Sequence, residues 1–238
     1  MDTSQKIEIC GAGSSFSFTL FRSEPIPLES LYDIIKKEEF SADLEKLKPG
    51  FMKIEKFSRV IIASFALPHK QELEVLRNGI ISKLEVPVLE TCRLYFLPGF
   101  LLLSGKSTPG KMALQILTPF MNVSSTNIKL SQSVITAFSE EAVIVKTAQF
   151  NKIPHHEIDK ITLSGELEEI FNFKGLPLRE AELTSFTGIF NSPFGIRTLK
   201  FSQQGKIQIY KSKKNTINLD LVEWLVSKLS DDSIVEQI

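Results

Sequence analysis

The sequence has two cysteines, one tryptophan, no net charge and no long apolar run, and each of these shortages excludes a class of protein. Its 28 basic residues equal its 28 acidic residues, so no overall field draws the molecule onto nucleic acid or an anionic membrane, and any such contact must come from a local patch. The longest apolar runs, such as Phe100–Leu103, fall far below the roughly 18 residues needed to cross a bilayer. We therefore expect no membrane partner.

The two cysteines lie far apart, at positions 10 and 92, in a chain whose first residues lack the charged and apolar stretches of a signal peptide. We expect both to be free thiols and the protein to be cytoplasmic. Eighteen Phe residues against three Tyr supply large apolar surfaces without a polar atom, which favours a Phe-rich core. The share of apolar residues, 42%, is ordinary for a globular chain, so we expect folded structure throughout.

The first half alternates strand-like and helical patterns. Alternation predicts strands over 6–10 and 15–21, and apolar spacing after Pro27 predicts a helix with Leu28, Leu31 and Ile35 on one face. Further strands are expected over 51–56, 59–67, 80–87 and 91–104, the last broken by a turn at 98–99, with His69 at a strand end. Thr108 is expected to cap a helix that ends near Pro119.

The second half follows a polar stretch that we interpret as a linker. The expected organisation is a first half over 1–121, a linker over 122–131 and a second half over 132–238. Strands are predicted over 142–150, 184–190, 195–202 and 206–211. A final helix is predicted over 219–229 with Asn218 as its cap. The segment over 157–173 is ambiguous, because its apolar spacing favours a helix while Thr162 and Gly165 weaken that prediction.

The two halves share one unit: a strand, a turn that contains Gly, a second strand, a Lys-Ser pair and a helix. The unit begins at Arg93 in the first half and at Arg197 in the second. Because hairpins followed by helices are common, chance similarity is the alternative to duplication. The sequence therefore predicts an α+β fold, an antiparallel sheet with helices packed on one face, and a pseudo-two-fold duplication.

No catalytic, metal or cofactor signature is complete. Ser104-Gly105-Lys106-Ser107 resembles the end of a phosphate-binding loop, but the first glycine of that motif is misplaced. Gly11-Ala12-Gly13 lacks the third glycine of a dinucleotide site, and His155-His156-Glu157 consists of neighbours that point in different directions. No Gly-x-Ser-x-Gly elbow accompanies the three histidines. We assign no catalytic residue, no metal ligand and no cofactor.

Basic and aromatic residues gather in the C-terminal hairpin. Such residues suit phosphate contacts combined with stacking or wedging against bases, although lysines that protect a solvated sheet edge would give the same pattern. The candidate nucleic-acid-binding residues are Phe96 in the first hairpin and, in the second, Arg197, Phe201, Lys206, Tyr210, Lys211 and Lys213.

The second hairpin resembles the repeat of TATA-box-binding proteins, in which a strand that ends in Leu-x-Phe turns through Gly-Lys into a second strand. Leu199, Phe201, Gly205 and Lys206 carry the resemblance. In that family two repeats form a saddle whose concave sheet binds the DNA minor groove. The resemblance thus implies that Phe96 and Phe201 wedge between bases and that Lys206 contacts a phosphate.

These observations favour a non-enzymatic binding module with DNA or RNA as its first candidate ligand. The alternative is a protein-interaction or oligomeric adaptor protein. The hairpin over 94–103 is apolar on both strand faces and therefore has to be buried on both. This makes a protein partner or a homodimer the second candidate. A cytosolic enzyme that acts on a small molecule without a recognisable motif is the third.

Overall fold

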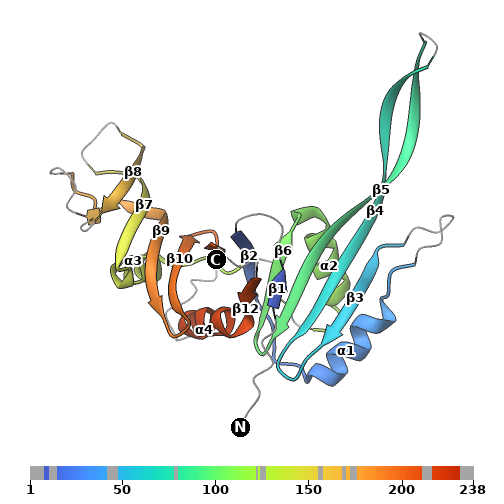
Figure 1. The fold of residues 1–238 in the computed structure, drawn as a ribbon, viewed down its shortest axis with the longest axis horizontal. Coiled ribbons are helices and arrows are strands. Elements are labelled where there is room, and N and C mark those ends of the chain that lie inside the picture. Colours follow the sequence, from blue (N-terminus) through green and yellow to red (C-terminus); the bar gives the residue numbers. More distant parts are fainter. Residues whose placement is uncertain are drawn as a thin grey trace. The chain divides into compact units, whose positions relative to one another are not determined.

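The computed structural model describes residues 8–10, 15–41, 48–77, 80–121, 123, 127–154, 158–167, 170–171, 176–210 and 216–230. The chain divides into two compact units (Figure 1). Residues 21–126 form the first, here called the N-terminal unit, and residues 1–20 with 127–238 form the second, the C-terminal unit. The division falls within the expected linker, but the first 20 residues belong with the C-terminal half.

The N-terminal unit is an antiparallel sheet covered by two helices. Its strands are β3 (Gly50–Lys56), β4 (Ile61–Arg77), β5 (Ile80–Leu97) and β6 (Phe100–Gly105), hydrogen-bonded in that order. The helices are α1 (Leu28–Lys37) and α2 (Ser107–Leu117). Both helices contribute to one buried cluster with Phe65, Leu94 and Phe96, so both lie on the same face of the sheet.

The helix expected after Pro27 is confirmed as α1, with Leu31 and Ile35 buried. Proline suits this position because the amide it lacks has no partner in the first helical turn. The expected Thr108 cap is wrong. Helix α2 begins two residues earlier than expected, at Ser107, with Lys106 at the cap position and no side-chain hydrogen bond to the free amides.

Strands β4 and β5 form one hairpin that is much longer than the sequence predicted. They pair without a break from Ile61↔Phe96 to Arg77↔Ile80, so the expected breaks after residues 67 and 87 are wrong and His69 lies inside a strand. The prolines explain the error. Pro68 and Pro87 lie two positions apart along the β4–β5 ladder, in pairs of the same hydrogen-bonding type. A proline is tolerated at both positions because its nitrogen faces the outer edge of the hairpin and not the partner strand.

The apolar hairpin over residues 94–103 is buried on both faces, as its composition predicted. Leu94 and Phe96 lie in the helix-covered cluster, while Tyr95 and Leu102, which face each other across the ladder on the other side, are buried as well. This burial arises within a single chain. It therefore does not by itself require self-association.

The large strands of the C-terminal unit are also paired antiparallel. These strands are β2 (Ser15–Arg22), β11 (Lys206–Tyr210), β10 (Gly195–Ser202), β9 (Glu182–Ser192), β7 (Ile144–Asn151) and β8 (Lys160–Leu167), in that spatial order. Residues 15–19 of β2 pair with β11 in this unit. A separate two-stranded ladder joins β1 (Glu8–Cys10) to β12 (Thr216–Asn218).

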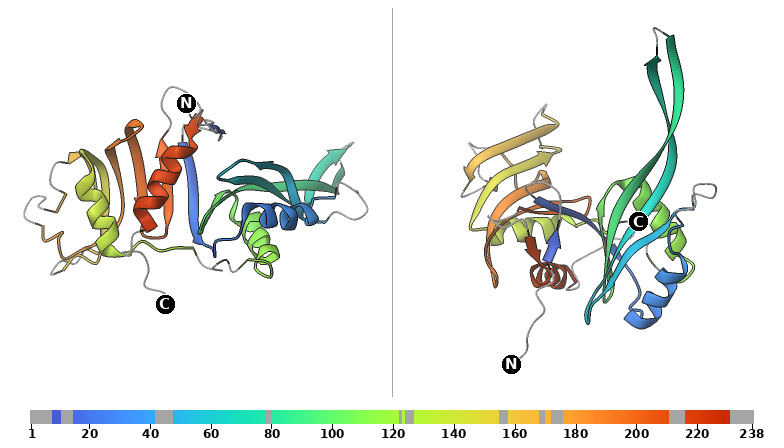
Figure 2. Two further views of the ribbon diagram at one scale, coloured as in Figure 1. Left: turned by 90° about the horizontal axis from the view of Figure 1, so that it is seen from below. Right: turned by 45° about the vertical axis from the view of Figure 1, so that its right-hand side comes forward.

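Helices α3 (Gln132–Glu141) and α4 (Leu219–Ser230) lie along the same side of this sheet (Figure 2). Asn218 caps α4 as expected, because its Oδ1 accepts a hydrogen bond from the Asp220 amide at 3.1 Å. Helix α3 was not foreseen. Its own cap is Ser131, whose hydroxyl accepts from the Val134 amide at 3.3 Å.

The segment expected to be helical within 157–173 contains strand β8 instead. Leu163 is buried at its pairing with Ala148 of β7, and Thr162 and Gly165 both disfavour a helix. Pairing with an existing strand therefore outweighs the local apolar spacing. The described residues form an α+β protein with antiparallel sheets, and the duplication remains a prediction.

Candidate nucleic-acid interface

The sheet of the C-terminal unit has one covered and one open face, and strict alternation along three neighbouring strands produces both. Leu199 and Phe201 of β10, like Ile207 and Ile209 of β11, point toward the helices and are completely buried. Phe16, Phe18 and Leu20 continue this covered face on β2. The residues between them occupy the opposite, open face.

Phe201 lies in the middle of the covered face and belongs to the core. Its ring stacks on Phe138 of α3 at 4.7 Å and on Phe186 of β9 at 5.4 Å between centroids. Phe96 is equally buried, in the cluster of the N-terminal unit. The wedge role implied for these two residues is therefore corrected, because a side chain must leave the core before it can enter a base step.

The open face carries hydroxyl, amide and ammonium groups in register. Gln208 lies between Lys200 of β10 and Ser17 of β2, while Lys206 pairs with Thr19 and Tyr210 with Ser15. These side chains are half-buried except Lys206, which is exposed. Thr198 and Ser202 extend the same face along β10, and Ser185 and Thr187 of β9 pair with Ser202 and Lys200. The open face is therefore lined by polar side chains.

The charge on these three strands is of one sign. The sequences of β2, β11 and β10 contain no Asp or Glu, and on the open face Lys200 and Lys206 supply the positive charge. A locally basic surface thus lies on a chain whose formal net charge is zero. This arrangement favours an anionic ligand at this face.

Hydrogen bonds fix part of the open face. The Gln208 side-chain amide donates from Nε2 to Ser15 Oγ at 2.6 Å, across the β2–β11 pairing. The neighbouring Ser17 hydroxyl is buried and has no hydrogen-bond partner within the part of the chain that is described. Gln208 and Ser15 are therefore held in position by each other, without a ligand.

The remaining predicted site residues fall in different places. Tyr210 lies on the open face at the end of β11. Arg197 alternates onto the side of Leu199 and Phe201, and its Nη1 donates to the Ile196 carbonyl at 3.0 Å. Lys211 and Lys213 lie outside the described residues. Of the seven predicted residues, the structure thus brings Lys206 and Tyr210 together.

Sequence reasoning did not select Lys200 and Gln208 as site residues. The signal that identifies them is the alternation in β10 and β11, where apolar residues at 199, 201, 207 and 209 leave 200, 206 and 208 on the other face. That same alternation assigns Phe201 to the core once the helix-covered side is known.

The other motifs of the sequence carry no site in the described residues. Lys106, at the start of α2, forms an ion pair with Glu90 at 2.5 Å, and this hydrogen bond lowers the pKa of the Glu90 carboxyl. His69 is exposed within β4, and His155–Glu157 lie outside the described residues. The Cys92 thiol is free and buried, and burial raises its pKa to about 12.

Across the described ranges, no three His, Cys, Asp or Glu side chains are grouped so that they could hold a metal ion. Among the same residues, no helix has the length and apolarity needed to cross a membrane. No protein-family model matches this chain, and neither does any of the curated proteins with which it was compared.

Proposed function

We propose that this chain is a non-enzymatic module that binds DNA or RNA on the open face of β2, β11 and β10. One observation carries the proposal: three adjacent strands without a carboxylate present Lys200, Lys206, Gln208 and Tyr210 on the face opposite the described helices α3 and α4 (Figure 2). The opposite face of the same strands holds the core.

The chemistry of this face suits the nucleic-acid backbone. Lysine, serine, threonine, glutamine and tyrosine side chains commonly contact phosphates and sugars, and such contacts position the ligand without reading its sequence. Tyr210 adds an aromatic ring on which an unpaired base can stack. With Phe96 and Phe201 in the cores, binding proceeds without wedging and shows little sequence preference.

The arrangement of elements also supports an internal duplication. The N-terminal unit runs α1-β3-β4-β5-β6-α2, and the C-terminal unit runs α3-β7-β8-β9-β10-β11-β12-α4, with β8 added at an edge and β12 before the last helix. In both units the last hairpin of the large sheet precedes the second helix. We infer a shared ancestral unit of the kind found in TATA-box-binding proteins, and fold ancestry of this kind leaves the ligand open.

The test is fluorescence anisotropy with labelled single- and double-stranded DNA of mixed sequence, measured over a salt series. Two lysine–phosphate contacts predict a slope of log affinity against log salt of about −1.4 on single strands and about −1.8 on duplex. Lys206→Glu should weaken binding at least about tenfold and reduce the slope by roughly one contact.

Lys111→Glu is the matched control, because Lys111 is an exposed lysine on α2 and the substitution changes net charge equally. Its affinity should stay within about twofold of the wild type if location, and not total charge, matters. Equal losses in the two variants, or no binding at low salt, would remove this proposal.

A protein-interaction function is the second candidate. It has its own supporting observation, the exposed apolar residues of the long β4–β5 hairpin. These residues belong to the N-terminal unit and are independent of the basic face.

A further inference from the structure

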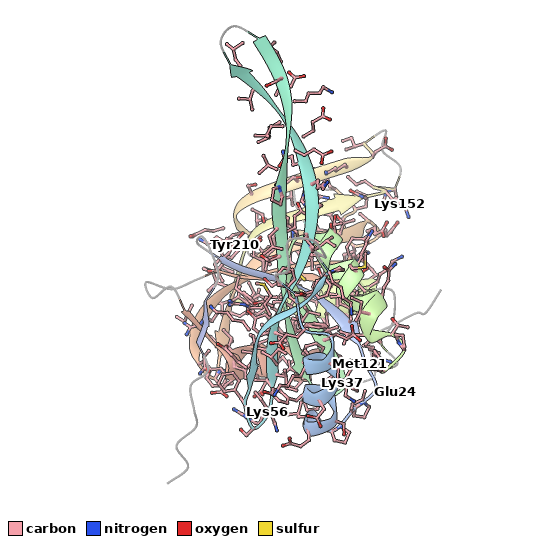
Figure 3. All side chains as sticks on the ribbon, turned by 90° about the vertical axis from the view of Figure 1, so that its right-hand side faces the viewer. Glu24, Lys37, Lys56, Met121, Lys152 and Tyr210 are labelled. Atoms are coloured by element: carbon pink, nitrogen blue, oxygen red, sulfur yellow. The ribbon has the colours of Figure 1, made fainter. Side chains whose placement is uncertain are left out.

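The far part of the β4–β5 hairpin, here called the arm, consists of residues 67–77 and 80–91. Strand β3 pairs with β4 only as far as Ala66, and β6 pairs with β5 only from Cys92 onward. The arm is therefore a two-stranded ribbon that extends beyond the other strands of its unit (Figure 1). Figure 3 shows its side chains standing out on both sides of the ribbon.

One face of the arm is uncharged and largely apolar over three consecutive pairs. Register places Leu73 opposite Leu84, Gln71 opposite Val86 and Val75 opposite Ser82 on this face. Leu73 and Leu84 expose 40% and 44% of their surfaces. An exposed apolar strip of this kind on a free ribbon is typical of an interaction site.

The opposite face is charged near its middle and apolar at its end. Lys70 forms an ion pair with Glu85 at 2.9 Å, and Lys83 pairs with Glu72 at 2.5 Å. Beyond these pairs, Leu76 faces Ile81 with 69% and 67% of their surfaces exposed. The outer part of the arm thus presents large apolar side chains on both faces.

The charge of the arm disfavours polyanionic ligands. Residues 67–91 contain three basic and four acidic side chains, so the arm has a slight negative charge. Nucleic acid and anionic lipid surfaces attract clusters of Lys and Arg, which this segment lacks. The apolar residues therefore indicate a protein surface as the partner.

The area of the arm distinguishes a partner that encloses it from one that packs against one face. The outer stretch of the arm from Gln71 to Leu76 has a face about 20 Å long and about 10 Å wide, roughly 200 Å², so two copies stacked face to face there bury roughly 400 Å². Stable interfaces bury at least about 1,200 Å² in total. Contact around the whole perimeter offers roughly 800 Å² on the arm alone, which meets that requirement.

Addition of a partner strand to the base of the arm is opposed by proline. Pro68 in β4 and Pro87 in β5 each remove an amide from an outer edge, and prolines on edge strands prevent further pairing. The large exposed side chains lie further out, on both faces of the ribbon, and favour side-chain contact over strand addition. We propose that the arm inserts into an apolar cleft of a partner protein, which encloses Leu73 and Leu84 on one side and Leu76 and Ile81 on the other.

The first experiment places a photo-reactive benzoylphenylalanine at position 76, 84 or 196 of the full-length chain, in the cells that produce the protein. Ile196 is the control, because it is as exposed as Leu76 but lies in the C-terminal unit. The proposal predicts that positions 76 and 84 cross-link to the same protein and that position 196 does not.

The second experiment measures affinity for that partner, once it is purified, by calorimetry. Leu76→Thr with Ile81→Thr, and separately Leu73→Thr with Leu84→Thr, should each weaken binding at least tenfold, since both faces are enclosed. Val143→Thr with Ile196→Thr removes two equally exposed apolar residues elsewhere and should leave affinity within twofold. Thermal unfolding of all the variants should match the wild type, because threonine keeps the strand preference at exposed positions.

Several outcomes would overturn the proposal. These are a cross-link only to a second copy together with a dimer mass in light scattering, a cross-link only to lipid, and no cross-link from position 76 or 84. A loss of affinity confined to one pair of substitutions would replace enclosure with contact on a single face.

Discussion

Gln208 donates a hydrogen bond of 2.6 Å from its side-chain amide to the hydroxyl of Ser15, and these two residues lie 193 positions apart in the sequence. The bond joins β2 to β11 on the open face of the C-terminal unit. Ser17, two residues further along β2, directly faces Gln208 in the ladder, yet its buried hydroxyl has no partner among the described residues. The same strand thus contains a satisfied and an unsatisfied serine.

This contrast predicts opposite effects of two identical substitutions. Ser15→Ala should lower the free energy of unfolding by about 0.5–1.5 kcal/mol, because it removes a hydrogen bond. Ser17→Ala should be neutral or should raise it by up to about 1 kcal/mol, because it removes a buried hydroxyl without a partner. Urea unfolding of the two variants checks both signs, and a marked loss of stability in Ser17→Ala would show that this hydroxyl is satisfied.

Two hairpin glycines should differ in their tolerance of alanine. Gly99 and Gly205 both have positive φ, 77° and 69°. A Cβ at Gly99 would meet nothing within 4 Å, whereas one at Gly205 would overlap the backbone oxygen of Ile128. Gly99→Ala should therefore cost about 1–2 kcal/mol from backbone strain alone. Gly205→Ala should cost more than about 3 kcal/mol or prevent folding, which melting temperatures would show.

A substitution at Phe201 is expected to change stability alone, and a substitution at Lys206 is expected to change DNA affinity alone. Phe201→Leu should lower the free energy of unfolding by about 1–2 kcal/mol through loss of its stacking on Phe138 and Phe186, while DNA affinity stays unchanged. Lys206→Glu should weaken DNA affinity and leave the free energy of unfolding unchanged, since the Lys206 side chain is exposed. Chemical unfolding and anisotropy on both variants test this. A loss of affinity in folded Phe201→Leu would restore the wedge role.

Cys92 should be chemically silent in the native protein. Burial raises the pKa of its thiol to about 12, and the thiolate is the reactive form. In a Cys10→Ser background, a disulfide reagent at pH 8 should label Cys92 only at the rate at which the protein unfolds. Labelling should become rapid in denaturant, and rapid native labelling would contradict the buried position.

The same pKa shift has a consequence for stability at high pH. The unfolded thiol ionises near its ordinary pKa of 9, while the folded thiol keeps its proton up to about 12. Above pH 9 the unfolded chain therefore binds fewer protons, so this group's contribution to stability is complete below pH 9 and is lost as pH rises toward 12. The fall in unfolding free energy between these pH values should be smaller in Cys92→Ala than in the wild type.

Sequence by itself determined the features that depend on neighbours along the chain. The helix after Pro27, the cap at Asn218 and the strands of the C-terminal hairpin follow from apolar spacing, proline geometry and alternation, which act over a few residues. The two-sided burial of the hairpin over residues 94–103 followed from its composition. These local preferences agree with the final fold, so they could be predicted.

Tertiary structure decided the features that depend on a partner element. The position of α3 makes the Phe201 side of β10 the core and leaves Lys200 on the open face, whereas alternation alone cannot say which side is covered. The segment over residues 160–167 is a strand because β7 offers it a ladder. The ribbon continues through Pro68 and Pro87 because the nitrogens of those prolines face an edge that needs no donor, a property of the pairing and not of the local sequence.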